Sequence, residues 1–329
     1  MRRHVWLASV LGLASSVLGC PTTATPDAAT PMSDAFVPPG TDGGPVPEDT
    51  GASALPVIQT GTRAAPLPAM LACANTATSI MPMGGAPVSG ILNVSALGLS
   101  STPVATTAIQ VYTGAGVATG CAAPGCQTVT TDATGNAMIS LPSGGWFAYR
   151  VPSNAASVPG LGFFYTWGTA AGATTEVTAI SGAAADIVAG QLNRELNSST
   201  SAVSGSVRDC AGANMANLQI RMFRGDTEII SGARAETMTP RISGVGDTAI
   251  PMPTTNGLTA FAGRFAGVLP SAGGDIRIEA WGIPAAGGTQ ELVACEVVSV
   301  EPASVTVAVL GPYRSDYAAG SPCAGRRAM

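Results

Sequence analysis

The residues of this chain that could do chemistry are carboxylates, arginines and cysteines, because most of the usual proton-transfer groups are missing. His4 is the only histidine, and the 329 residues contain no lysine. If residues 1–19 are removed as an export signal, no Ser-His-Asp triad, histidine metal site, Schiff-base lysine or phosphate-binding lysine can form. Paired Asp or Glu residues, as in glycosidases, are the chemistry that remains, but no aromatic-lined carboxylate cluster is evident. We therefore expect no catalysis, no cofactor and no metal, with a carboxylate-dependent hydrolase as a distant alternative.

Cysteines are the next reactive group. In an exported protein, an even set favours disulfides over metal ligation. Besides Cys20 there are six cysteines: Cys73, Cys121, Cys126, Cys210, Cys295 and Cys323. Cys121 and Cys126 bracket Ala-Ala-Pro-Gly and can close a small loop. Cys210 and Cys295 are the best remaining pair. Cys73 and Cys323 would then bond to each other or stay free. Alternatively, Cys323 pairs with Cys210, which would change the assignment.

An aromatic cluster lies between positions 146 and 167. On a strand, Phe163, Tyr165 and Trp167 would share one face, so that face is either core or an exposed platform. We favour core, because the rest of the chain offers few large side chains. The alternative is a platform that stacks on sugar rings or binds a protein. The cluster consists of Trp146, Phe147, Tyr149, Phe163, Phe164, Tyr165 and Trp167.

A second alternating stretch runs from 275 to 281. Ile276, Ile278 and Ala280 would face the core, while Asp275, Arg277, Glu279 and Trp281 would form a solvated face with cross-strand ion pairs. Trp281 beside carboxylates is also conceivable as a ligand surface. The possible interaction residues are therefore Trp146, Tyr165, Trp167 and Trp281.

Two aspartates resemble calcium ligands only superficially. Asp132 and Asp209 lie outside any run of acids with the spacing that hard cations need. We expect both to form turns; Asp132 can bond its own backbone and Gly135 can take a positive φ.

The N-terminus decides which compartment these residues meet. Arg2 and Arg3 precede a charge-free apolar run from Val5 to Leu18, too short to span a bilayer comfortably, as in a secretory signal. The next motif, Val17-Leu18-Gly19-Cys20, resembles the lipobox of bacterial lipoproteins. That resemblance implies removal of residues 1–19, lipidation of Cys20 and a membrane anchor. Pro21 after the cysteine resembles the pattern directed to the outer membrane.

Residues 20–70 are predicted to be a linker. This region is rich in Pro, Thr, Gly and Ala and has no periodic apolar pattern, so it is expected to be a disordered tether. Beyond the signal the chain carries 20 acidic residues and 13 arginines, a formal net charge of −7. This charge argues against nucleic acid as a partner.

Two β domains are predicted after the tether. Residues 71–200 contain short β-branched and aromatic runs between turn residues, the pattern of a sandwich or barrel. Ile109 and Val111 alternate with polar or small neighbours, which predicts a strand with one buried face. Ser181 can cap one short helix near 182–196.

Residues 201–329 repeat the first domain. Pro87-Val88-Ser89-Gly90-Ile91 is echoed by Ala202-Val203-Ser204-Gly205-Ser206, and Leu141-Pro142-Ser143-Gly144-Gly145 by Leu269-Pro270-Ser271-Ala272-Gly273. Such a duplication indicates two tandem domains of one fold. Alternation of Leu218, Ile220 and Met222, and later of Val305, Val307 and Val309, predicts strands in the second copy.

The stretches VSGSVRDCAGANMANLQIRMF and TTNGLTAFAGRFAGVLP resemble the carboxypeptidase-regulatory-like (transthyretin-like) β-sandwich, as does TTDATGNAMISLPSGGWFAYRV in the first copy. The resemblance implies an all-β fold of two tandem Ig-like or transthyretin-like sandwiches, and no activity. We expect a lipid-anchored bacterial envelope protein that acts as a structural or protein-interaction module. Its expected partners are the membrane and either another envelope protein or a polysaccharide; the alternative function is a carbohydrate or small-ligand binding module.

Overall fold

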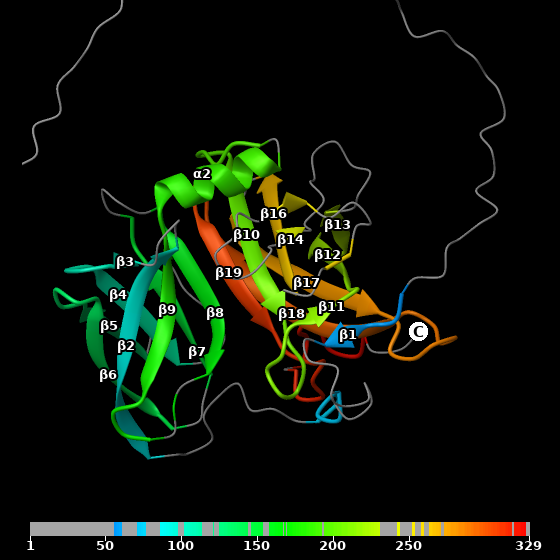
Figure 1. The fold of residues 1–329 in the computed structure, drawn as a ribbon, viewed down its shortest axis with the longest axis horizontal. Helices are drawn as coiled ribbons and strands as arrows, with labels where there is room; N and C mark the ends of the chain where they lie inside the picture. Colours follow the sequence, from blue (N-terminus) through cyan, green and yellow to red (C-terminus); the bar gives the residue numbers. More distant parts are fainter. Residues whose placement is uncertain are drawn as a thin grey trace, which may run out of the picture. The chain divides into compact units, whose positions relative to one another are not determined.

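The computed structural model describes residues 56–60, 71–76, 86–97, 102–113, 121, 125–143, 146–153, 158–166, 168, 170–192, 194–230, 242–243, 252–253, 258–259, 263–270, 273–317 and 319–326. These residues form β-strands and one short helix, so the all-β prediction is confirmed (Figure 1). The elements are β1 (Gln59–Thr60), β2 (Pro87–Leu97), β3 (Thr102–Pro103), β4 (Ala108–Thr113), β5 (Cys126–Thr130), β6 (Asn136–Pro142), β7 (Trp146–Val151), β8 (Gly160–Thr166), β9 (Thr174–Ile180), α2 (Gly182–Gln191), β10 (Thr200–Val207), β11 (Met215–Ala216), β12 (Gln219–Arg224), β13 (Thr227–Ile230), β14 (Ile242–Ser243), β15 (Met252–Pro253), β16 (Arg264–Pro270), β17 (Gly274–Gly282), β18 (Glu291–Val300) and β19 (Val305–Leu310).

One strand arrangement occurs twice. In the first copy, β2 pairs with β6 antiparallel and with β9 parallel; in the second, β10 pairs with β16 antiparallel and with β19 parallel. The other sheet of each copy has the orders β5-β4-β7-β8 and β13-β12-β17-β18. The echoed sequence motifs fall on β2 and β10 and at the ends of β6 and β16, so the repeat in sequence corresponds to a repeat in topology.

The two copies are joined edge to edge. β8 of the first copy pairs in parallel with β19 of the second, with Gly160 opposite Val305 and Phe163 opposite Ala308. The result is a seven-stranded sheet in the order β16-β10-β19-β8-β7-β4-β5 (Figure 1). We call it the shared sheet. Pairing β8 with β19 satisfies backbone groups that two separate sandwiches would leave on open edges.

Each copy has its own core. In the first, Ile109 and Val111 are fully buried against Leu92 and Phe147. In the second, the predicted inward residues Ile276 and Ile278 are buried, and with the rest of their row they pack in one cluster that also takes in Leu161 and Phe163 from β8. The strand alternation read from the sequence is therefore confirmed for these rows, and β8 contributes to the second core as well.

Two short segments before the first sandwich pack on the second. Residues 57–60 lie inside the predicted tether, yet Ile58 is buried and its amide donates to the carbonyl of Ile283. Room for Ile58 exists because residue 282 is a glycine: a Cβ there would lie 2.6 Å from the Ile58 Cγ1 atom. Farther along, Asn75 donates its amide to the carbonyl of Tyr313. Ordered structure thus begins before position 71, because an apolar run in the linker finds a hydrophobic site.

The helix is shorter than the expected span near 182–196. Ser181 caps it, since the Ala184 amide donates to the Ser181 hydroxyl at 3.1 Å. At the other end the amides of Leu192 and Arg194 both donate to the Ala189 carbonyl, which closes the last turn early. Within the described part of the chain, no helix is long and apolar enough to cross a membrane.

Candidate functional site

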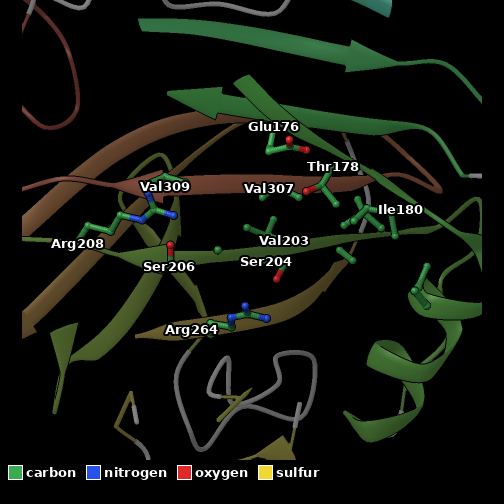
Figure 2. Close-up of a pocket in the computed structure, with 15 residues that line it drawn as sticks. Glu176, Thr178, Ile180, Val203, Ser204, Ser206, Arg208, Arg264, Val307 and Val309 are labelled. Carbon is green, nitrogen blue, oxygen red and sulfur yellow. The ribbon is translucent and has the colours of Figure 1, made fainter. Parts of the chain in front are cut away.

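A trough of about 320 Å³ opens on one face of the shared sheet (Figure 2). Its floor is formed by β10 and β19, where Ser204 lies opposite Val307 and Ser206 lies opposite Val309. Thr178 and Glu176 line it from β9, and Arg264 from β16. The trough therefore lies where the last strand of the first copy passes over the sheet of the second.

Helix α2 covers one end of this face of the shared sheet and leaves the other end open. Ala185, Ala189 and Leu192 of the helix pack in one cluster with Ala202 and Val305 of the sheet. Val307 packs against the edge of this cluster and, like Val309, remains only half-buried. An apolar surface that the helix does not cover is thus left beside Ser204 and Ser206.

The aromatic cluster is core wherever its side chains are described. Phe147, Tyr149 and Phe163 are almost completely buried, and the Tyr149 hydroxyl donates to the carbonyl of Thr178 at 2.8 Å. The rings of Phe147 and Tyr149 lie 6.4 Å apart. Trp167 and the side chains of Trp146, Phe164 and Tyr165 lie outside the described residues. The preferred interpretation as core therefore holds for the three described members.

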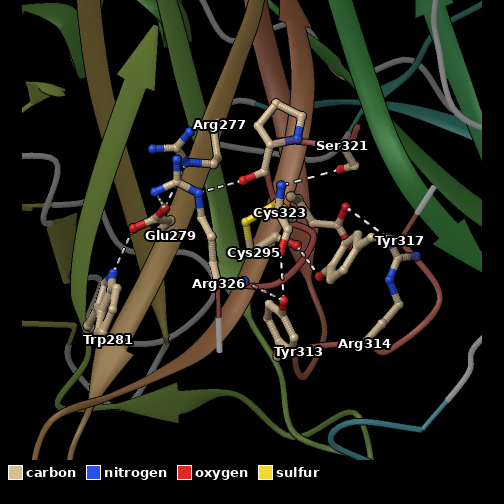
Figure 3. The surroundings of a disulfide bond; sticks show 12 residues. Arg277, Glu279, Trp281, Cys295, Tyr313, Arg314, Tyr317, Ser321, Cys323 and Arg326 are labelled. Atoms are coloured by element: carbon tan, nitrogen blue, oxygen red, sulfur yellow. Dashed lines mark hydrogen bonds and ion pairs between the residues drawn. A yellow bond between two sulfur atoms is a disulfide. The ribbon is translucent and has the colours of Figure 1, made fainter. Parts of the chain in front are cut away.

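The expected solvated face of β17 is exposed at Asp275, as predicted, but is buried farther along the strand. Arg277 and Glu279 have side chains only 2% exposed, and the Arg277 Nε atom lies 2.7 Å from a Glu279 carboxylate oxygen. Trp281 is half-buried and donates its indole N–H to Glu279 at 2.9 Å (Figure 3). The Arg277 guanidinium also stacks 4.3 Å from the ring centre of Phe223. These residues form a structural network, which corrects the prediction of a solvent-facing row for Arg277, Glu279 and Trp281.

A C-terminal strap, residues 311–317 and 319–326, lies against β17 and β18 and buries this network. Cys323 of the strap is bonded to Cys295 of β18. The Tyr317 hydroxyl donates to the Cys295 carbonyl, and the Tyr313 hydroxyl to the Cys323 carbonyl, both at 2.6 Å (Figure 3). Arg326 lies 3.7 Å from the Glu279 carboxylate. The sequence pattern of β17 could not show that a segment 30 residues or more downstream of it folds back and covers its charged face.

The strap also encloses a carboxyl group. Glu296 of β18 is 5% exposed and lies 3.4 Å from the guanidinium of Arg314. Burial raises the pKa of Glu296 to about 8; Arg314 opposes this rise and Asp316 adds to it. Burial, with the nearby Glu296, likewise raises the pKa of the Tyr317 hydroxyl. Glu279 and Glu296 both lie buried beside arginines, so neither lines an open catalytic cleft.

The Arg277–Glu279 pair gives a measurable prediction. Glu279→Gln removes the buried carboxylate beside Arg277 and leaves only the exposed Asp226, 3.8 Å away. We expect a loss of about 3 kcal/mol in the free energy of unfolding. Glu228→Gln is the matched control: Arg221 and Glu228 are also 2.7 Å apart, but the Arg221 side chain is 37% exposed. That change should cost about 1 kcal/mol or less. Urea unfolding of both variants tests this, and equal losses would contradict the assignment.

The six cysteines form three disulfides: Cys73–Cys210, Cys121–Cys126 and Cys295–Cys323. The short loop closed by Cys121 and Cys126 was predicted. The preferred Cys210–Cys295 pair is wrong, and Cys73 and Cys323 do not bond to each other. Cys210 instead meets Cys73 in the segment that packs on the second copy, and Cys295 meets Cys323 in the strap. Both partners arrive through tertiary contacts that local sequence does not encode.

Both predicted turn aspartates form turns. The Asp132 carboxylate accepts the amides of Thr134 and Asn136, and the Asp209 carboxylate accepts those of Ala211 and Ala213. Hydrogen bonds from the Thr134 hydroxyl, and then from the amides of Asn136 and Thr134, lower the pKa of Asp132. Gly135 has the expected positive φ of 80°. Among the described residues, no group of three or more His, Cys, Asp or Glu side chains could hold a metal ion.

Comparison with known proteins identifies no family. No protein-family model matches the chain, and no curated protein is found as a relative. Among solved structures, the TIE protein of Bacillus anthracis is 12% identical with a TM-score of 0.20; the match covers 68% of this chain, which spans only 34% of that one. The minor pilin of Streptococcus agalactiae is 12% identical with a TM-score of 0.20, covering 70% of this chain and 98% of the pilin. A variant of the shaft pilin SpaA from Lactobacillus rhamnosus GG is 10% identical, covering 69% and 98%, with a TM-score of 0.22. Likenesses of this size assign no function.

The residues around the trough were not among those selected from the sequence. Arg208, Arg264 and Glu176 belong to three different strands or strand ends, so their proximity depends on the sheet order. One local signal was available: Ser204, Ser206 and Arg208 alternate along β10 and its end, so they share a face. Cys20, the predicted lipidation site, lies outside the described residues.

Proposed function

We propose that this chain is a structural or protein-interaction module of the bacterial cell envelope, held at a membrane by acyl chains on Cys20, and that it performs no catalysis. The observation that carries the proposal is the pairing of all six remaining cysteines in three disulfides. Such bonds form and persist in oxidising compartments outside the cytosol. The charged N-terminal residues, the apolar run and the lipobox-like Val17-Leu18-Gly19-Cys20 support export and acylation.

The joined sandwiches support a structural role. The parallel pairing of β8 with β19 and the ion pair between Arg150 and Glu301, 3.1 Å apart, fasten one copy to the other. The β8–β19 strand pair and this ion pair therefore hold the two copies together. We further propose that each copy is a carboxypeptidase-regulatory-like domain, which the repeated strand order supports, and that Pro21 favours delivery to the outer membrane. Partners would then be an envelope protein or a polysaccharide.

Replacement of Cys20 tests the anchor. We expect Cys20→Ala to move the protein from the membrane fraction to the soluble fraction and to abolish incorporation of labelled fatty acid, because no thiol remains to be acylated. The double variant Cys121→Ala/Cys126→Ala, which removes a disulfide and keeps Cys20, should stay with the membrane. Recovery of wild-type protein in the soluble fraction without label would refute the proposal. Affinity capture from membranes with wild type and Cys20→Ala would then identify partners that require the anchored form.

A second candidate function is binding of a small ligand. The described aromatic side chains do not support a sugar-stacking platform at positions 147, 149 and 163, since these are buried. The trough on the shared sheet is the observation that favours a ligand.

A further inference from the structure

The trough changes in polarity along its length. At one end, Ala184 and Ala185 of α2 stand beside Ile180 and over the Ala202–Val305 pair. Four residues farther along β10, Ser206 is paired with Val309 on one side and with Arg264 on the other. At about 3.3 Å per residue, these ends lie roughly 13 Å apart. The trough thus runs from an apolar end under the helix to a polar end at the arginines.

Basic groups predominate at the polar end. Arg208, which follows β10, is exposed at the end far from α2, and Arg264 lies beside Ser204 and Ser206 (Figure 2). Among the described residues that line the trough, Glu176 is the one carboxylate, and it comes from β9 on the opposite wall. The described lining thus holds two guanidinium groups and one carboxylate. Arginine is also the side chain best suited to bind a carboxylate through paired N–H groups.

At the apolar end, none of the described lining residues is charged. The first-turn amides of α2 at Ala184 and Ala185 already donate to the hydroxyl and carbonyl of Ser181, so recognition there is hydrophobic. Val305, Val307 and Val309 continue this apolar surface along the floor toward Arg208. A molecule lying in the trough therefore meets aliphatic side chains over most of its length and guanidinium groups at one end.

We propose that the trough is a binding site for a small amphipathic carboxylate with an aliphatic stem. The stem lies on the valines of β19 and under α2, where burial of each methylene contributes to affinity. The carboxylate accepts hydrogen bonds from Arg208 and Arg264. A cationic amphiphile fits less well because, among the described lining residues, the arginines outnumber the carboxylate of Glu176. A sugar finds no aromatic side chain among those same residues. This site does not depend on the anchor at Cys20.

Titration calorimetry of the full chain carrying Cys20→Ala tests the ligand class. Octanoate, octanol and octylamine share a stem and differ in head group, while acetate has the head group without the stem. We expect saturable binding of octanoate at least about 10-fold tighter than of octanol, with octylamine and acetate weaker still. Equal affinities for octanoate and octanol, or no saturable binding of octanoate, would overturn the proposal.

Charge-neutralising variants locate the site. Arg208→Gln should weaken octanoate binding about 10-fold and leave octanol unaffected, because it removes one charged donor. Arg208 is exposed, so this variant is expected to fold, and circular dichroism checks it. Glu176→Gln should tighten octanoate binding or leave it unchanged, since it removes a negative charge from the lining. Octanoate affinity that is unchanged in Arg208→Gln and in Arg264→Gln would place the binding elsewhere and refute this site.

Discussion

Replacing both Cys73 and Cys210 with alanine is expected to lower the free energy of unfolding by about 5 kcal/mol, the largest effect among the three disulfides. This bond joins residues 137 positions apart, so it removes more conformational entropy from the unfolded chain than a short loop does. Cys73 lies in the segment that contacts the second sandwich, and its amide donates to the Cys210 sulfur. Breaking the bond also frees that segment from its site.

The loop closed by Cys121 and Cys126 supplies the control. These residues are 5 positions apart, so the double alanine variant should lose only about 2 kcal/mol. Urea unfolding of both double variants under identical conditions measures the difference. A loss for the short loop as large as that for Cys73–Cys210 would show that loop size does not govern the contribution.

Stability is expected to fall by several kcal/mol, about 5 at most, as the pH rises from 4.5 to 8, because of Glu296. The pKa of this buried carboxyl is raised from 4.5 to about 8 in the folded protein, chiefly by desolvation. Between those values the folded state holds a proton that the unfolded state has released, so raising the pH favours unfolding. The contribution is fully present below pH 4.5 and is lost as the pH passes through about 8. The charged or titratable groups facing Glu296 are Arg314, Asp316 and Tyr317.

Glu296→Gln isolates this effect from the other carboxylates. The glutamine side chain cannot ionise, so the variant and the wild type should have similar stability at about pH 5, and the variant should be the more stable at about pH 9. The measurement is the unfolding free energy in urea at several pH values. Parallel curves for the two proteins would show that Glu296 titrates normally. If the wild type instead became more stable relative to the variant as the pH rises, attraction of the Glu296 carboxylate to Arg314 would outweigh its desolvation.

Local sequence pattern was enough to predict the structural features that depend only on neighbouring residues. Strand alternation placed Ile109, Val111, Ile276 and Ile278 in the cores, because successive side chains on a strand face opposite sides. Hydrogen bonds over two to four residues made Asp132 a turn former and Ser181 a helix cap. Because no histidine or lysine follows the signal, catalytic mechanisms that need either side chain are excluded.

The sequence by itself therefore determined the all-β class, the repeat, one disulfide, the capped helix and the absence of most catalytic groups. Only the tertiary structure decided that β8 pairs with β19, that Ile58 is buried, and that the C-terminal strap encloses Arg277, Glu279 and Glu296. It also decided the partners of Cys210 and Cys295 and brought Arg208, Arg264 and Glu176 around one trough. The physical reason is range: periodicity and turn chemistry act over a few residues, whereas burial and edge pairing depend on segments that meet only when the whole chain is folded.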